Sequence, residues 1–371
     1  MTTSVCGAQV LVASDPQDAS RWDELVDHAP IPDVYYRAGY ALASEAAGHG
    51  KAIGLILNAN QAPLLLPLLL RPLSDLPFAR REPGVDAITP YGYGGLLPLS
   101  QTEPLTKLDV ATLLEELQRW CREAGIVSCF IRLHPLLAQE SWLDHDQLSR
   151  HASVLQFRMS TVAVDLTKWD GARQRPLGLH ERRRRALNHA QHTLRVSWSG
   201  TDLPLQEALE LFQKIYEERM VCLKATSFYL FPTAYYLSLG SRLPDNVAVA
   251  LAWLDRKVVG GYLFLADRQF THYHLGGSNE QGRELGAGTL LMNAGAQWAR
   301  GRGCKLLHLG GGVSNSDSLF EFKRSFGGNV YRYHTLEVIT DALRYCELVE
   351  RRFKFEPDWQ VRPGFFPQYR A

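Results

Sequence analysis

Two distant segments of this 371-residue chain share one pattern. Each is an amphipathic stretch that ends in Trp-x-Arg-x-x-Gly, at 120–125 and at 298–303. The apolar residues before each motif fall on one helical face. The arginine suits the negative end of a helix dipole, and the glycine suits a left-handed cap. An apolar strand is expected directly after each glycine, at 127–133 and at 305–309.

Strand hairpins are expected before both helices. In the first half the runs are 52–57 and 63–70, with a turn at 58–61; in the second half they are 247–254, 257–266 and 269–275. Short polar turns separate the runs. A meander, a helix and a strand, given twice, predict two copies of one α+β fold. Chance similarity of two helix ends is the alternative, and the matching order of elements favours duplication.

The length of the chain also favours two domains. We expect an N-terminal domain over 1–165 and a C-terminal domain over 166–330, with a polar linker at 168–176. Residues 331–371 are too few for a further domain. They are expected to pack back and complete the N-terminal domain.

Composition narrows the class of protein. The net charge is +1, so no global bias toward nucleic acid or membrane is present. The most apolar run, 62–70, is too short to span a bilayer. Residues 1–17 lack the basic and apolar regions of a signal peptide. Six cysteines without a CxxC pair fit a reducing compartment. We therefore expect a cytoplasmic protein with no transmembrane segment.

Several catalytic motifs are absent from the sequence. It contains no HExxH, no GxxxxGK[ST] and no GxSxG. His272 and His274 alternate on an expected strand, but the sequence shows no third ligand beside them. We predict that no metal takes part.

The segment 308–327 combines several features of a ligand site. Three glycines at 310–312 follow an expected strand and allow unusual backbone angles or close approach of a ligand. Ser318 and Glu321 have the spacing of a capping box, which predicts a short helix. Lys323 lies inside that helix. It could face a ligand, or it could be a solvated helix charge.

A second loop precedes the helix of the second repeat. Arg283, Gly286 and Gly288 form R-x-x-G-x-G, which resembles the pyrophosphate loop of the GNAT acyltransferases. Small residues at a helix N-terminus let backbone N–H groups approach an anion. We predict these three residues to be cofactor-binding. Ordinary turn glycines are the alternative.

Three further segments are candidate substrate-binding elements. The turn 86–95 contains Tyr91 and Tyr93 among glycines, which suits stacking or a phosphate contact, or simply a packed turn. Six arginines lie at 173–185, and Arg182 and Arg185 could bind phosphates. Four consecutive arginines cannot all point at one ligand, so a solvated helix is the alternative. Tyr216 and Tyr229 could line a cleft or belong to the core.

Taken in order, these segments resemble the FemABX-like, or BioF2-like, branch of the GNAT superfamily. The resemblance rests on 90–95, 182–190, 216–232, 273–278, 307–312 and 318–327. It implies two tandem GNAT-like domains, each a mixed, mostly antiparallel sheet flanked by helices. Well-known members move an amino acid from aminoacyl-tRNA onto an amine of a peptidoglycan precursor. A Phe-Lys pair lies at their reaction centre, and Phe322 and Lys323 match it here.

The resemblance leaves the acyl donor open. Family members hold acceptor phosphates with basic and tyrosine side chains, loosely matched here by the arginines at 182–185 and by Tyr216. The chain lacks the long heptad-patterned arm of some members. It keeps an R-x-x-G-x-G loop, which aminoacyl-tRNA would not require. The donor is therefore expected to be a co-substrate, either aminoacyl-tRNA or acyl-CoA, and no resident cofactor is expected.

The implied activity is acyl transfer that forms an amide on a cell-wall, surface-glycan or secondary-metabolite amine. Lys323 would stabilise the oxyanion, and Asp86, His308 or the substrate itself would take the proton. An acyl-CoA-dependent GNAT is the first alternative. A non-catalytic module that binds RNA or glycan is the second. DNA is not an expected partner, and the sequence does not predict an oligomeric state.

Overall fold

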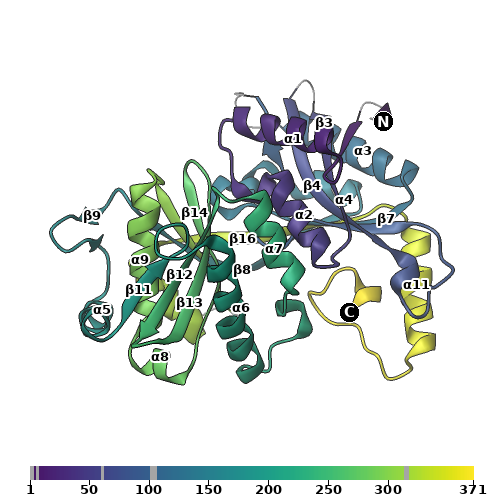
Figure 1. Ribbon diagram of the computed structural model, residues 1–371. Helices are drawn as coiled ribbons and strands as arrows, with labels where there is room; N and C mark the ends of the chain where they lie inside the picture. Colours follow the sequence, from purple (N-terminus) through teal and green to yellow (C-terminus); the bar gives the residue numbers. More distant parts are fainter. Residues whose placement is uncertain (1–3, 6–7, 60–61, 101–106, 313–316) are drawn as a thin grey trace. The chain divides into compact units, whose positions relative to one another are not determined.

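A computed structural model describes residues 4–5, 8–59, 62–100, 107–312 and 317–371 (Figure 1). The chain divides into two compact units. Unit 1 contains residues 1–30, 35–158 and 333–371, and unit 2 contains residues 31–34 and 159–332. The chain passes between the units inside β8 (Ser153–Asp165) and β16 (Asn329–Ile339). The segment expected as a linker instead forms a hairpin of β9 (Trp169–Asp170) and β10 (Arg175–Pro176) within unit 2.

The sheet of unit 1 has the strand order β1-β2-β3-β4-β5-β7-β16. Its strands are β1 (Ser4–Val5), β2 (Ala8–Val12), β3 (Lys51–Ala59), β4 (Ala62–Pro72), β5 (Val85–Ile88), β7 (Ile126–Arg132) and part of β16; β6 (Leu97–Pro98) pairs with β4. Only β5 and β7 pair in parallel among these described strands. The first predicted hairpin is β3–β4, and part of its predicted turn, residues 60–61, lies outside the described residues.

Helices cover both faces of this sheet, because successive side chains of a strand point to opposite faces. Leu55 and Leu57 pack with Leu114 of α3, whereas Ile56 packs with Trp22 of α1. The helices of unit 1 are α1 (Pro16–His28), α2 (Ala38–Ala46), α3 (Lys107–Glu123), α4 (His145–Arg150) and α11 (Ala342–Phe355).

The sheet of unit 2 has the order β8-β15-β14-β13-β12-β11. The further strands are β11 (Arg195–Trp198), β12 (Val247–Leu254), β13 (Lys257–Ala266), β14 (Phe270–Ser278) and β15 (Leu306–Gly310). Within this sheet β14 and β15 pair in parallel and the other described pairs are antiparallel. The predicted meander of three strands is confirmed.

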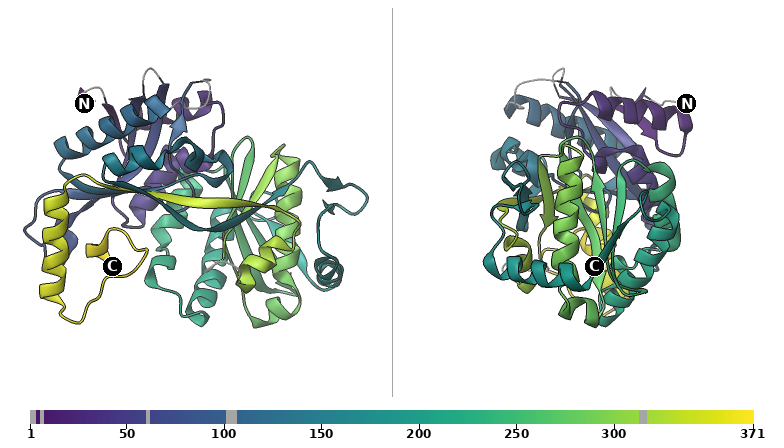
Figure 2. Two further views of the ribbon diagram at one scale, coloured as in Figure 1. Left: turned by 180° about the vertical axis from the view of Figure 1, so that it is seen from behind. Right: turned by 60° about the vertical axis from the view of Figure 1, so that its left-hand side comes forward.

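Two neighbouring glycines of β13 show how helices flank this sheet. A Cβ on Gly261 would meet Ile215 and Phe212 of α6, and a Cβ on Gly260 would meet Ala287 of α9. Helices α6 and α9 therefore cover opposite faces (Figures 1 and 2). The helices of unit 2 are α5 (Glu181–Thr193), α6 (Leu205–Cys222), α7 (Thr233–Arg242), α8 (Glu280–Glu284), α9 (Ala287–Gly301) and α10 (Ser318–Arg324). The predicted fold class, a mixed and mostly antiparallel sheet flanked by helices in each half, is confirmed.

Helix ends follow the sequence signals with one exception. Gly125 and Gly303 adopt φ of +66° and +82°, which confirms the left-handed caps. The predicted capping box on Ser318 is wrong by one residue. Asp317 is the N-cap, and its carboxylate accepts a hydrogen bond from the Phe320 backbone N–H. No helix in the described part of the chain is both long and apolar enough to cross a membrane.

Candidate active site in unit 2

Lys323 is turned inward on α10. Its side chain is 7 % exposed, although Arg324 beside it is exposed. The ammonium group donates a hydrogen bond to the Gly311 carbonyl oxygen at 2.6 Å. It also lies 5.3 Å from the centre of the Tyr273 ring. The interpretation of Lys323 as a solvated helix charge is therefore wrong.

Burial lowers the pKa of Lys323 to about 7, and the Asp317 carboxylate opposes this shift only in part. Taking an ammonium group out of water disfavours its charged form. Near neutral pH the side chain is therefore divided between ammonium and amine. It can donate a hydrogen bond in either form, and its proton is held weakly. Such perturbed groups are typical of functional sites.

Phe322 is held by an arginine that the sequence did not single out. The Arg183 guanidinium lies 4.5 Å from the centre of the Phe322 ring. Its Nε donates to Ser325 Oγ at 2.8 Å, and a terminal nitrogen donates to Thr289 Oγ1 at 3.4 Å. Arg183 therefore joins α5 to both α9 and α10. Burial and the neighbouring Arg182 lower the pKa of Arg183.

The run of four arginines therefore divides into two sets. Arg183 is directed inward, whereas Arg182, Arg184 and Arg185 are exposed. Arg185 pairs with Glu181 at 2.5 Å on the surface of α5. Exposed pairs of this kind contribute roughly 0–1 kcal/mol. The predicted phosphate-binding residues Arg182 and Arg185 lie on a solvated face, and they stay candidates for an anionic ligand.

The glycines of the predicted pyrophosphate loop have structural explanations in the backbone angle of Gly286 and the packing of Gly288. Gly286 has φ of +78°, and a Cβ there would lie 3.4 Å from the Ala186 carbonyl oxygen of α5. A Cβ on Gly288 would lie 2.8 Å from the Tyr262 hydroxyl. Arg283 lies exposed on α8. Both glycines are thus explained by the backbone and its neighbours, so their presence alone does not indicate a bound pyrophosphate.

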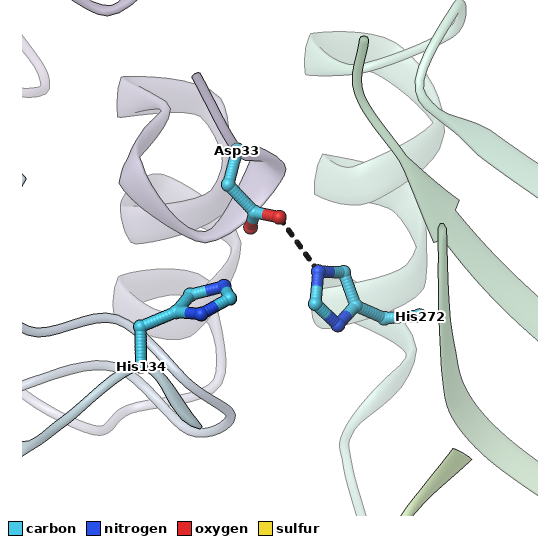
Figure 3. Close-up of side chains that lie close together, drawn as sticks. All are labelled: Asp33, His134 and His272. Atoms are coloured by element: carbon cyan, nitrogen blue, oxygen red, sulfur yellow. Dashed lines mark hydrogen bonds and ion pairs between the residues drawn. The ribbon is translucent and has the colours of Figure 1, made fainter. Parts of the chain in front are cut away.

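His308 belongs to a buried group on β14 and β15. The His272 Nδ1 atom lies 3.3 Å from His308 Nδ1. The His272 Nε2 atom lies 2.7 Å from Asp33 Oδ2, as Figure 3 shows. His274 has a separate partner, because its Nε2 atom lies 2.7 Å from the Tyr235 hydroxyl. Burial, with a further contribution from His272, lowers the pKa of His274 to about 3. Asp33 carried no signal in the sequence, since 239 residues separate it from His272.

The predicted site residues of unit 1 take part in contacts that stabilise its fold. Asp86 is fully buried and forms ion pairs with Arg71, at 2.6 Å, and with Arg370. The Tyr91 carbonyl oxygen accepts a hydrogen bond from another tyrosine, and the Tyr93 ring lies 5.1 Å from the ring of Tyr333. Two guanidinium groups pair with the Asp86 carboxylate, which favours a structural role for Asp86 over that of a proton acceptor.

The two tyrosines of the α6–α7 region lie in different environments. Tyr216 is buried on α6 and its ring stacks on Phe212 at 5.6 Å. Tyr229 is 40 % exposed in a short 3-10 turn, Ser227–Tyr229. The contacts favour the interpretation of Tyr216 as a core residue, and they leave Tyr229 accessible to a ligand.

The comparisons with known proteins match this architecture. Residues 179–324, which include α5, α9 and Lys323, match the family model of the acetyltransferase (GNAT) domain. No curated protein sequence matches the chain. The predicted resemblance to the GNAT superfamily is confirmed, and the matched family is one of acyltransferases, as the sequence predicted.

Solved structures extend the likeness over both units. A FemX crystal structure has a TM-score of 0.66 at 13% identity, covering 89% of this chain and 98% of that one. L-PGS from Bacillus licheniformis has a TM-score of 0.56 at 10% identity, with 91% and 96% covered. A tandem GNAT protein from the clavulanic acid biosynthesis pathway has 0.50 at 11%, with 90% and 98% covered. At these identities the likeness shows a shared tandem GNAT-like fold.

Proposed function

We propose that this protein transfers an aminoacyl or acyl group to an amine and so forms an amide bond. The observation that carries the proposal is the burial of Lys323 against the Gly311 carbonyl, within the region that matches the GNAT model. A cation or hydrogen-bond donor that is fixed in a site without water stabilises a developing oxyanion far more than the same group does in water. The acceptor is proposed to be an amine of a cell-wall, surface-glycan or secondary-metabolite molecule.

The reaction makes two demands on the site. The acceptor nitrogen attacks the acyl carbonyl carbon as a neutral amine, and an oxyanion forms on the carbonyl oxygen. Lys323 donates a hydrogen bond to that oxyanion, and Phe322 beside it forms an apolar wall fixed by Arg183. The carbon–oxygen or carbon–sulfur bond of the donor then breaks, the leaving hydroxyl or thiol group takes up the proton that the amine loses, and the amide remains.

An aminoacyl ester is the donor that we favour. The glycines that suggested acyl-CoA already have structural explanations, because Gly286 has φ of +78° and a Cβ on Gly288 would lie 2.8 Å from the Tyr262 hydroxyl. The exposed arginines of α5 offer positive charge for a polyanionic donor such as tRNA. The FemABX resemblance supports the same choice.

An acyl-CoA-dependent N-acyltransferase is the second candidate. The matched family model describes an acetyltransferase, and a tandem GNAT protein shares the fold. Calorimetric titration with CoA and with aminoacyl-tRNA separates the two candidates. Binding of charged tRNA with a steep salt dependence supports our choice, whereas binding of CoA alone supports the acyl-CoA enzyme. Bulky substitution of Gly288 does not separate them, because the new side chain would strike Tyr262.

The catalytic role of Lys323 is tested by Lys323→Met. The variant keeps an apolar chain of similar length, so we expect it to fold and to bind acceptor. Turnover should fall about 10²- to 10³-fold, the usual cost of one lost oxyanion donor, with KM little changed. Arg324→Met removes the exposed neighbouring charge and is the matched control. Acyl transfer is followed by mass spectrometry of the acceptor. Near-normal turnover of the Lys323→Met variant would contradict the proposed role of Lys323.

A further inference from the structure

The β9–β10 hairpin and α5 enclose a cavity that arginines of both elements line. Its volume is about 420 Å³, and all of its lining residues belong to unit 2. Figure 1 shows the hairpin beside α5. None of the lining residues takes part in the contacts of Lys323 described above. We call this site the arginine cavity, and apart from Glu181 its polar lining residues are Arg173, Arg175, Arg184, Arg185, Asn188 and Gln191.

Helix α5 turns one side toward the arginine cavity. Residues at intervals of three or four lie on one side of a helix, and four lining residues have this spacing: Glu181, Arg184, Asn188 and Gln191. Arg183 points elsewhere, because its guanidinium contacts Phe322 and Ser325 of α10. Neighbouring arginines of one run therefore serve different sides of α5.

The hairpin is bonded to α9 at the residue between its two arginines. The Gln174 backbone carbonyl oxygen accepts hydrogen bonds from the side-chain amides of Asn293 and Gln297, at 3.3 and 2.8 Å. The backbone around Arg173 and Arg175 is thereby held in place. A site that is ordered before its ligand arrives loses less entropy on binding.

The arginine cavity has an excess of positive charge. Four guanidinium groups line it, whereas two carboxylates pair with them. Asp170 pairs with both hairpin arginines, with nitrogen–oxygen distances of 3.3 and 3.8 Å, and Glu181 pairs with Arg185 at 2.5 Å. In the part of the chain that the structure describes, no ion pair involves Arg184. Like charges gathered in this way repel one another and attract an anion.

The side chains of the cavity fit phosphate groups. Guanidinium groups bind phosphate oxygens through two parallel hydrogen bonds. The amides of Asn188 and Gln191 can donate to or accept from hydroxyl groups such as those of ribose. Among the described residues that line the cavity none is aromatic, so no ring there stacks on a base. Such a surface binds the backbone of a nucleic acid rather than its bases.

We propose that the arginine cavity is a phosphate-binding site that holds the sugar–phosphate backbone of an RNA ligand. The proposal rests on the proposed function in the choice of RNA, because an aminoacyl ester is the donor that we favour. The cavity and Phe322 lie on different sides of α5, and a helix with its side chains is about 10–12 Å wide. A ligand must therefore be extended to reach both the cavity and Lys323. A free nucleotide presents the same phosphate chemistry without this length.

Binding of an unacylated RNA stem-loop with a single-stranded 3′ end tests the site without turnover. Fluorescence anisotropy at a series of salt concentrations gives Kd and its salt dependence. Arg173→Gln and Arg184→Gln should each raise Kd about tenfold, through one lost charged hydrogen bond. Each should also lower the slope of log affinity against log salt by about 1. Circular dichroism checks that both variants keep their fold.

Arg182→Gln is the matched control. It removes the same charge from an exposed position of the same helix, but Arg182 does not line the cavity. Its Kd should change at most about twofold, because salt screens charges that the ligand does not touch. An equal loss in Arg182→Gln and Arg184→Gln would show diffuse attraction and overturn the cavity as the site. Absence of RNA binding by the wild-type protein overturns it as well.

Competition identifies the source of the phosphate groups. ADP and inorganic pyrophosphate should displace the RNA only at far higher concentrations than unlabelled RNA does. If ADP binds as tightly as RNA and is weakened by Arg184→Gln, the phosphate site stands and the choice of RNA is overturned. Amide hydrogen exchange should slow in residues 169–176 and 181–191 when RNA is bound, and protection confined to other segments contradicts the proposal.

This proposal and the proposed function fail in different ways. Amide formation that depends on Lys323, without RNA binding at Arg173 and Arg184, overturns the cavity and leaves the proposed function standing. RNA binding that depends on Arg173 and Arg184, without amide formation from any acyl donor tested, contradicts the proposed function and leaves the phosphate site standing.

Discussion

Burial, rather than charge pairing, sets the protonation of Lys323. Its pKa is lowered to about 7 in the folded chain from an ordinary 10.5. The ammonium form is therefore lost as pH rises through about 7. In the window between these values the unfolded chain binds one more proton than the folded chain, so the stability contributed by this site rises with pH.

This rise of stability with pH gives a prediction that can be tested without substrate. Competitive labelling with an amine-reactive reagent, read by mass spectrometry, should give Lys323 a midpoint near 7. Urea unfolding should show wild-type protein gaining roughly a few kcal/mol over Lys323→Met as pH rises from about 7 toward 10.5. A labelling midpoint at the ordinary lysine value would contradict the burial argument.

Single residues were predicted from the sequence only where a pattern marked them. Phe322 and Lys323 were found through the FemABX resemblance, and the direction of Lys323 came only from the structure. Arg183 could not be told from its three neighbours, because a run of identical residues has no periodicity. Asp33 could not be found at all, since its contact with His272 joins distant parts of the chain.

The short helix α10 is held in place by α5. The His180 backbone N–H donates to the Ser325 carbonyl oxygen at 3.0 Å, and a Cβ on Gly327 would overlap the backbone of Gly178. Arg183 adds its contacts with Phe322 and Ser325. A helix of this length is not stable by itself. Its position, and that of Lys323, therefore depends on these contacts.

Arg183→Met should loosen α10 without unfolding unit 2. A cation–π contact and a charged hydrogen bond are lost, which together cost on the order of 2 kcal/mol. Amide hydrogen exchange, followed by mass spectrometry, should become faster in residues 318–324. Arg182→Met removes an exposed arginine of the same helix and is the control. Unchanged exchange of α10 in Arg183→Met would show that the backbone contacts suffice.

Helices and strands were predicted from the sequence more fully than the contacts of single residues or the division into units. The meander β12–β14 follows from the alternation of side chains along each strand, and the two left-handed caps follow from glycine at the helix ends. Both signals act within a few residues. The α10 cap was misplaced by one residue because Asp317 and Ser318 are both good N-cap residues. Segment 168–176 is polar like a linker, yet it folds as a hairpin.

In the whole molecule, each compact unit contains segments that are not consecutive in the sequence. Residues 31–34 lie in unit 2, and residues 333–371 lie in unit 1. The repeated helix and strand pattern predicted two similar halves, and residues 331–371 were expected to complete the N-terminal half. No pattern in the sequence indicated that residues 31–34 belong to unit 2. The C-terminal end shows the consequence. The Tyr369 hydroxyl is hydrogen-bonded to Ser128 Oγ of β7 at 2.8 Å, and Arg370 forms an ion pair with Asp86 of β5.

Asp86 is therefore expected to stabilise unit 1 rather than to catalyse. Asp86→Asn leaves the Arg71 and Arg370 guanidiniums around a neutral amide, and breaking a buried pair in this way costs about 3–5 kcal/mol. Asp27→Asn removes the partly exposed carboxylate that pairs with Arg37 and should cost about 0–1 kcal/mol. Urea unfolding gives both values. Folded Asp86→Asn protein should keep wild-type kcat, because the carboxylate is already held by two cations. A large loss of kcat with little loss of stability would instead restore Asp86 as a proton acceptor.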